Sequence, residues 1–467
     1  MAYSSITKPT DHFNTVLWTG DGTSSRGITG VGFQPDWVWL KRRNSAANQN
    51  VYDIIRGATT YLLTDTNQPE NTVTDRLNSF DSDGFTVGDS SNTNASSSTY
   101  VAWNWLGAGT APSKTYTVKV VSDSGNKYRF DDFGTSAVTL EISEGGTYTF
   151  DQSDSSNSGH PLRFSTTSDG THGGGSEYTT GVTTTGTPGS SGAKTVITVA
   201  ASAPTLYYYC SSHSGMGGQA NTPTTNSFSD FSGSIQSNVS PNTTAGFSIV
   251  SFTGTGASAT VGHGLDTAPK MILVKNRDDT TTSWVVYHEA MGGTKYMSLD
   301  LSSAQSAATN IMFDNTDPTS SVFSVRNSNR TNGSSDDMIA YCFSNVKGYS
   351  KMGSYTGNGN ADGAFVHTGF KPAFVIIKRT TVSTGDWVMH DTKRDTFNVM
   401  DKRLWPSLSN AEGSNSVYNM DFLSNGFKTR NSNTLVNHSG SLYIYMAFAE
   451  NPLVGNDSGT GIPATAR

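Results

Sequence analysis

The chain reads Gly-Phe-Gln-Pro-Asp-Trp-Val-Trp-Leu-Lys-Arg at residues 32–42, and this phrase returns twice in altered form. The later versions are Gly-Leu-Asp-Thr-Ala-Pro-Lys-Met-Ile-Leu-Val-Lys at 264–275 and Gly-Phe-Lys-Pro-Ala-Phe-Val-Ile-Ile-Lys-Arg at 369–379. In each version a proline stands before an apolar run typical of a strand, where its missing N–H costs no ladder hydrogen bond. The stretch therefore predicts three copies of one β-domain.

Each copy also has a shared opening phrase and an apolar closing strand. The openings lie at 13–22, 247–256 and 349–359, and the closing strands at Tyr100–Trp105, Met338–Phe343 and Tyr443–Phe448. A period near 100 residues suits small domains and is too long for the turn of a solenoid. The first two openings lie more than twice as far apart as the last two, so a segment of domain size follows the first copy.

The composition favours many short strands joined by polar turns. Apolar residues make up only 34% of the 467 residues, yet aromatics reach 10% and stand in short alternating runs. No window shows helical periodicity. We predict an all-β protein of tandem β-sandwich or jelly-roll domains strung in a line, each with its own core.

The repeats and the composition shifts set the expected domain boundaries. They are a first copy at 1–110, an inserted domain at 111–220, a Pro/Gly/Thr-rich linker at 221–246, a second copy at 247–346, a third copy at 347–452 and a polar tail at 453–467. Within the linker, Phe228-Ser-Asp-Phe231 is expected to dock on a neighbouring domain.

Charge and hydropathy disfavour several classes of partner. The formal net charge is −7, and the 31 Lys and Arg residues are scattered, so no basic stripe predicts nucleic-acid binding. The sequence contains no run of 18 apolar residues, so we expect no transmembrane helix. The first residues lack a charged segment followed by an apolar one, so we expect no signal peptide and synthesis in a cytoplasm. Cys342, in a closing strand, is expected to be a buried free thiol.

Cys210 lies in a different setting, in Cys-Ser-Ser-His-Ser-Gly-Met at 210–216. The loop offers the thiolate of Cys210, the imidazole of His213 and the thioether of Met216, and His160 could arrive from a neighbouring strand end. Two histidines, a cysteine and a weak methionine form a soft ligand set that suits copper. His172 is a further candidate near this site.

This inserted domain resembles the cupredoxins, the plastocyanin-like blue-copper domains. The resemblance rests on Tyr-Tyr-Tyr-Cys-Ser-Ser-His-Ser-Gly-Met at 207–216 and Gly-His-Pro-Leu-Arg-Phe at 159–164. It implies a Greek-key β-sandwich with His160, Cys210, His213 and Met216 as copper ligands. A long Gly/Thr/Ser-rich loop at 165–193 departs from the family pattern. The alternative is that the protein retains the sandwich fold but binds no metal. Electron transfer is disfavoured as the purpose of a copper site, because the sequence offers no second redox centre as a partner.

The repeats carry scattered polar residues that could suggest catalysis. His288 and His390 follow matching apolar strands and align with Asp53 of the first copy. The equivalent position therefore carries a carboxylate in one copy and an imidazole in the other two. We expect turn and strand-end roles for these residues and no enzyme active site. Trp284 and Trp387, which precede such strands, are expected in the core.

The outer copies are similar to a repeat of virion proteins from tailed phages of marine bacteria. The resemblance rests on the phrases already quoted, on Tyr-Asp-Ile-Ile-Arg-Gly-Ala at 52–58 and on Ser-Phe-Asp-Ser-Asp-Gly-Phe-Thr-Val-Gly at 79–88. Copies two and three lack the Arg-Gly-Ala wording. The resemblance implies a virion component: a tail fibre, spike or capsid-attached fibre.

Several partners would follow from such a role. Other virion proteins and a host surface glycan or protein are expected, and homotrimerisation would bury exposed strand edges. A copper redox protein and a glycan-binding adhesin are the alternative functions.

Overall fold

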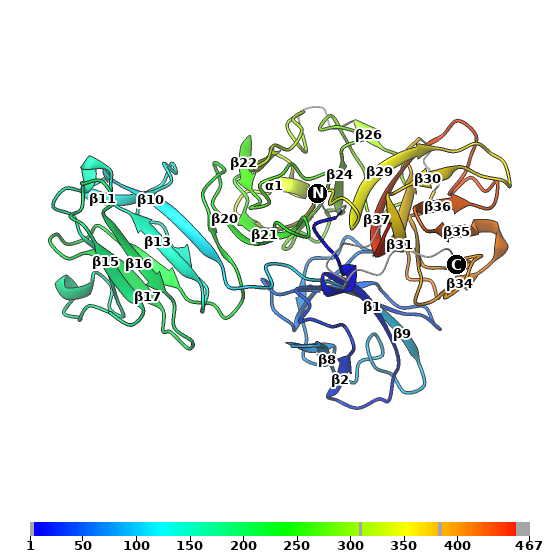
Figure 1. Ribbon diagram of the computed structural model, residues 1–467, viewed down its shortest axis with the longest axis horizontal. Coiled ribbons are helices and arrows are strands. Elements are labelled where there is room, and N and C mark those ends of the chain that lie inside the picture. The colour runs from blue at the N-terminus through cyan, green and yellow to red at the C-terminus, as the bar shows by residue number, and fades with distance from the viewer. Residues whose placement is uncertain (1–3, 308–310, 382–384, 454–467) are drawn as a thin grey trace. The chain divides into compact units, whose positions relative to one another are not determined.

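The computed structural model describes residues 4–307, 311–381 and 385–453. Strands dominate this part of the chain (Figure 1), which confirms the all-β sandwich class. The helical elements described are all short: α1 (Asn329–Asn332) and the 3-10 turns η1 (Pro9–Asp11), η2 (Ser155–Asn157), η3 (Gly170–Gly173) and η4 (Ser416–Tyr418).

The chain divides into two compact units. The repeat unit holds the residues up to Gly107, Asn242–Ser258 and those from Leu265 onward, and it therefore contains all three copies. The inserted unit holds Ala108–Pro241 and Ala259–Gly264.

The three copies build the same four-stranded antiparallel arrangement, in which the last strand lies between the first and the second. The neighbours run β1-β9-β3-β4 in copy one, β21-β28-β23-β24 in copy two and β29-β37-β31-β32 in copy three. Their bounds are β1 (Phe13–Thr19), β3 (Trp37–Arg42), β4 (Asn50–Asp53), β9 (Thr99–Trp105), β21 (Phe247–Thr253), β23 (Met271–Asn276), β24 (Val285–His288), β28 (Asp337–Phe343), β29 (Ser350–Thr356), β31 (Phe370–Arg379), β32 (Val388–Asp391) and β37 (Leu442–Pro452). The repeat inferred from the sequence is therefore a repeat of topology as well.

Shorter strands complete the copies. In copy one, β5 and β6 extend the main sheet, and β2-β8-β7 form a second sheet. In copy three, β30-β36-β35 form the corresponding second sheet. The bounds are β2 (Arg26–Thr29), β5 (Thr60–Leu63), β6 (Asn71–Thr72), β7 (Leu77–Asp81), β8 (Gly84–Val87), β25 (Lys295–Tyr296), β26 (Ser306–Ala307), β27 (Val322–Val325), β30 (Phe365–His367), β33 (Lys402–Arg403), β34 (Gly413–Ser414), β35 (Met420–Leu423) and β36 (Gly426–Thr429).

The main sheets are buried on both faces. In β3, Val38 and Leu40 pack toward the second sheet of their own copy, whereas Trp37 and Trp39 enter a core that also contains residues of copies two and three. The ring centroids of Trp37 and Tyr341 lie 4.6 Å apart. Aromatic contacts in this core also join copy one to copy three, through Phe13 and Phe448 at 5.0 Å, and copy two to copy three, through Phe343 and Phe448 at 6.1 Å.

The expectation of independent cores strung in a line is therefore wrong. Each copy has too few apolar layers of its own to cover both faces of its main sheet, so the copies cover one another. Trp284 and Trp387 are fully buried in this shared core, as predicted, and Cys342 is a buried free thiol.

Strand pairing also corrects the alignment of the polar strand ends. The equivalent pairs are Trp37 with Asp53, Met271 with His288, and Phe374 with Asp391. Asp391, and not His390, is therefore the counterpart of Asp53.

These three strand ends connect the copies in a ring. Tyr341 of copy two donates its hydroxyl to Asp53 of copy one (2.7 Å), Trp103 of copy one donates Nε1–H to Asp391 of copy three (3.0 Å), and His288 of copy two donates Nε2–H to the Tyr445 carbonyl of copy three (3.4 Å). Each copy thus contacts both of the others through an equivalent strand end, so the repeat unit has an approximate three-fold arrangement within one chain.

The inserted unit is a two-sheet sandwich. One sheet has the order β11-β10-β13-β16-β15 and the other β12-β18-β17-β14. The bounds are β10 (Ser113–Ser122), β11 (Asn126–Phe130), β12 (Leu140–Glu141), β13 (Thr147–Asp151), β14 (Leu162–Ser165), β15 (Val182–Thr185), β16 (Lys194–Thr198), β17 (Leu206–Cys210) and β18 (Gly218–Asn221). Three strands that follow belong to neither of these two sheets: β19 (Phe228–Asp230), β20 (Ser237–Asn242) and β22 (Ala259–Gly262).

Side chains from both sheets fill the core of this unit. Tyr116 and Phe150 come from the first sheet, and Phe164 and Tyr208 from the second. Phe231 packs into the same core, 5.7 Å from Tyr116 between ring centroids, which confirms the predicted docking of its segment. The stretch expected to be a linker is thus mostly part of the inserted unit.

Candidate metal centre

Two neighbouring strands bring the predicted ligands together at one end of the inserted sandwich. The antiparallel strands β14 and β17 pair Leu162 with Cys210, so His160, two residues before Leu162, reaches the end of β17. A Ser211 N–H to Pro161 carbonyl hydrogen bond of 3.1 Å continues this pairing. His213 lies in the turn that follows Cys210. Residues 50 positions apart in sequence therefore share one site.

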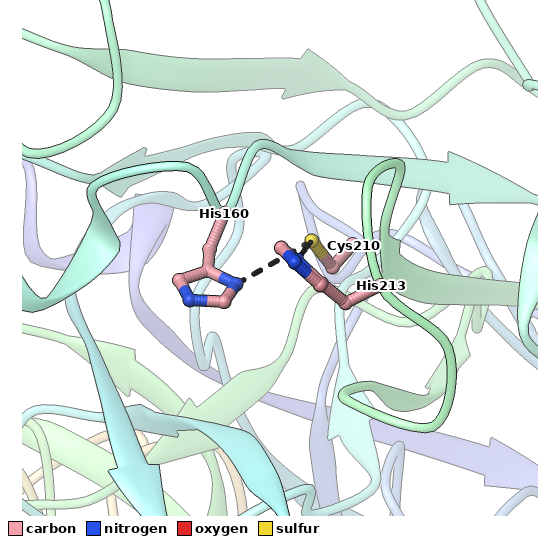
Figure 2. A group of neighbouring side chains, drawn as sticks. All are labelled: His160, Cys210 and His213. Carbon is pink, nitrogen blue, oxygen red and sulfur yellow. Dashed lines mark hydrogen bonds between the residues drawn. The ribbon is translucent and has the colours of Figure 1, made fainter.

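The donor atoms form a compact triangle. Cys210 Sγ lies 3.8 Å from His160 Nδ1 and 3.7 Å from His213 Nδ1. The three ligand atoms all lie within 4.8 Å of one another (Figure 2). One ion bound at about 2.0–2.3 Å by a sulfur and two nitrogens would hold those atoms roughly 3.5–3.8 Å apart. The sulfur–nitrogen edges of the triangle thus have the size that a shared metal ion requires.

Met216, the fourth predicted ligand, is buried at 1% exposure and belongs to the same apolar cluster as Cys210. Its backbone carbonyl accepts a 3.0 Å hydrogen bond from the Tyr128 N–H. The structure therefore holds Met216 near the end of β17, and axial ligation by its thioether stays a prediction.

The environment of His160 favours the form of its side chain that binds metal. Cys210 is buried, His160 is half-buried and His213 is exposed, so the triangle can be reached from solvent. Burial, with His213 as a second cause, lowers the pKa of His160 and thereby favours the neutral imidazole. Burial and the neighbouring Cys210 raise the pKa of Tyr128.

Two residues that the sequence did not single out fix the position of His160. The Tyr128 hydroxyl and the Gln152 side-chain amide donate to the His160 carbonyl, at 2.8 and 2.9 Å. Gln152 also accepts from the Leu162 N–H at 3.1 Å. Both contacts to His160 end on its backbone carbonyl, and no sequence motif marks such a contact.

His172 lies at this site but not among the metal-facing atoms. Its Nε2 lies 3.0 Å from the Cys210 carbonyl oxygen. A carbonyl oxygen can only accept, so Nε2 carries the proton in this contact. His172 therefore supports the backbone of a ligand residue.

Comparison with known proteins gives the family. The chain belongs to the family described as a domain of unknown function, DUF7483. The family model matches residues 8–132 and 174–452 of this DUF7483 chain, a range that includes Cys210, His213 and Met216 but not His160. No curated protein and no solved structure matches the chain. In the described ranges, no helix has the length and apolarity needed to cross a bilayer.

Proposed function

We propose that the inserted unit binds one copper ion through His160, Cys210 and His213, with Met216 as a weak axial ligand. The triangle of Cys210 Sγ and the two imidazole nitrogens carries this proposal. A thiolate with two imidazoles and a thioether is the ligand set of trigonal copper sites, in which bound copper can exchange one electron. The cupredoxin resemblance of the same residues supports the choice of copper.

The test is metal titration of the reduced full-length protein. We expect one Cu(II) per chain and an intense visible thiolate-to-copper band, and Cys210→Ser should lose both. Cys342→Ser is the matched control, because Cys342 is the other buried thiol and lies in the repeat unit. Absence of stoichiometric copper would reject the proposal, and a colourless one-to-one zinc complex would keep the site but reject copper.

We also propose that the whole chain is a structural component of a tailed-phage virion, in a tail fibre, spike or capsid-attached fibre, and contributes to host-surface attachment rather than to catalysis. The resemblance of the repeat phrases supports this role. A second support is the closed ring of copies, since a shared apolar core and buried polar contacts stabilise a protein that must persist outside a cell.

Purified particles test this second proposal. An antibody against the repeat unit should label intact virions at fixed positions, and the chain should be present in their mass spectra at structural stoichiometry. Absence from purified particles would contradict the proposal. Sedimentation of the full-length chain tests the predicted homotrimer, and a glycan array tests the predicted surface glycan.

A further inference from the structure

A short segment after β14 contacts both ends of the loop that carries the ligands. We call residues 166–176 the strap and residues 210–216 the ligand loop. In the strap, the Asp169 carboxylate accepts a 2.8 Å hydrogen bond from the Gly215 N–H, and His172 Nε2–H donates to the Cys210 carbonyl at 3.0 Å. The strap thus bridges the first residue of the ligand loop and the residue before Met216.

The conformation of the strap is well defined by its own contacts. Gly170 has φ +55°, and a Cβ there would come within 2.5 Å of the Tyr209 ring, so only glycine fits this close packing beside Cys210. At the base, the Ser165 hydroxyl donates to the Ser176 carbonyl at 2.7 Å. The Gly-rich composition that departs from the cupredoxin pattern therefore permits a close approach to the ligand strand.

The ligand loop is held from β11 as well. The Tyr128 N–H donates to the Met216 carbonyl at 3.0 Å, and Lys127 Nζ donates to the Gly215 carbonyl. Both backbone polar groups of Gly215 are thus bonded to side chains outside the loop. A loop fixed on two sides cannot readily change the distance between Cys210 and His213.

We infer that the strap is a positioning element of the metal centre, with Asp169 and His172 as positioning residues that preset the separation of Cys210 and His213 before metal binds. The inference rests on the proposed copper site. Groups that orient metal ligands without touching the metal typically change affinity by about 10–100-fold when removed. They act by holding the ligands in the bound geometry, so the metal does not have to order the loop.

The experiment uses full-length Asp169→Ala and His172→Ala. We expect each to weaken Cu(II) affinity by about 10–100-fold and to shift the visible band and the EPR spectrum, because the sulfur–copper geometry relaxes. Asp169→Asn and His172→Gln keep an acceptor and a donor at these positions and should restore most of the wild-type affinity and spectrum. Thr171→Ala, an exposed change in the same 3-10 turn, is the matched control.

A second measurement needs no metal. Hydrogen exchange of the Gly215 amide in the metal-free protein should accelerate in Asp169→Ala and stay slow in Asp169→Asn. If wild-type protein binds no copper, the proposed function fails, while the exchange result still decides whether the strap holds the loop. Wild-type copper affinity and spectra in folded alanine variants would overturn the inference, and so would unchanged Gly215 exchange. If an alanine variant does not fold, the Asn and Gln variants and their exchange rates decide in its place.

Discussion

The ends of β4 and β32 differ in chemistry from the end of β24, although all three occupy the same place in the ring of copies. Asp53 and Asp391 are buried carboxylates, each paired with an arginine three residues later, Arg56 and Arg394, at 2.5 Å. At the third position, His288 accepts from the Ala290 N–H and donates to a carbonyl of the next copy. The position requires a polar group that bonds across the interface, and either an ion pair or a neutral imidazole satisfies it.

By sequence, copies two and three both lack the Arg-Gly-Ala segment of copy one. In copy three, however, Arg394 reproduces the contacts of Arg56, including a 3.1 Å hydrogen bond to a carbonyl two residues before the aspartate. Only copy two has exchanged the pair, since Met291 stands three residues after His288. The copy-one–copy-two and copy-one–copy-three interfaces of the ring are therefore charged, and the copy-two–copy-three interface is neutral at this position.

The largest effect is expected from Asp53→Ala. Burial alone would lower the pKa of Arg56, but Asp53, Tyr341 and Glu70 outweigh burial and raise it. Removing Asp53 leaves a buried guanidinium without its main partner, which should cost about 3–5 kcal/mol of unfolding free energy. Denaturant titration followed by tryptophan fluorescence measures this cost selectively, because all eight tryptophans belong to the repeat unit.

The control for that variant is Asp11→Ala, which removes a half-exposed carboxylate paired with the surface residue Lys8. Surface pairs contribute about 0–1 kcal/mol, so the control should lie close to wild type. Equal midpoints for the two variants would show that the Asp53 pair does not stabilise the ring.

A smaller effect, visible only in acid, is expected at the neutral interface. Burial lowers the pKa of His288 to about 4 from 6.5, and the hydrogen bond to Tyr445 only partly opposes it. Between pH 6.5 and 4 the unfolded chain takes up a proton that the folded chain does not bind, so stability falls as the pH falls. The full loss is about 3 kcal/mol, and His288→Gln should remove it because glutamine does not titrate.

The measurement is the denaturation midpoint of wild type and His288→Gln at several pH values from 7 to 4.5. Burial lowers the pKa of His390 as well, to about 3, so a remaining acid response in the variant is expected, and the difference between the two proteins isolates His288. His438→Gln, at an exposed position, should follow wild type. Parallel loss of stability in wild type and His288→Gln would contradict the prediction.

The number of copies could be inferred from the sequence more easily than the way in which they pack. The apolar pattern of the strands nevertheless indicates the shared core. The runs Trp37–Leu40 and Tyr443–Phe448 are almost continuously apolar, and a strand with one solvated face would alternate instead. Such runs indicate burial on both faces. They do not say what covers the second face, because that depends on contacts between copies more than 100 residues apart.

The cluster of candidate ligands was predictable to a similar depth. The sequence grouped His160, Cys210 and His213 by ligand type and spacing, because two imidazoles and a thiolate form a soft ligand set, and the structure places their donor atoms within 4.8 Å of one another. The supporting contacts of Tyr128 and Asp169 go to backbone groups. Backbone groups are present at every position, so the sequence carries no mark of which ones are bonded.

The smallest effects should distinguish the two charged interfaces from each other. Glu412 of copy three accepts from Arg43 of copy one at 2.8 and 3.0 Å and from Arg394 at 3.1 Å. Glu70 of copy one accepts from Arg277 of copy two at 2.7 and 2.8 Å, but its contact with Arg56 is longer, at 3.8 Å. The first carboxylate therefore bridges two arginines closely, and the second bonds mainly one.

Glu412→Gln should accordingly cost more than Glu70→Gln, about 2 against about 1 kcal/mol, since a hydrogen bond to a charged group contributes about 1.5–3 kcal/mol and partial exposure reduces it. Burial would raise the pKa of Glu412, but Arg43 and Arg394 outweigh burial and lower it, which agrees with the larger cost. Glutamine keeps the shape of both side chains, so packing is unchanged, and each variant loses the negative charge together with one acceptor oxygen. The readout is the fluorescence midpoint at pH 7, and added salt should narrow the difference between the variants. A larger loss in Glu70→Gln would mean that the interface between copies one and two is the stronger of the two charged contacts, against the distances.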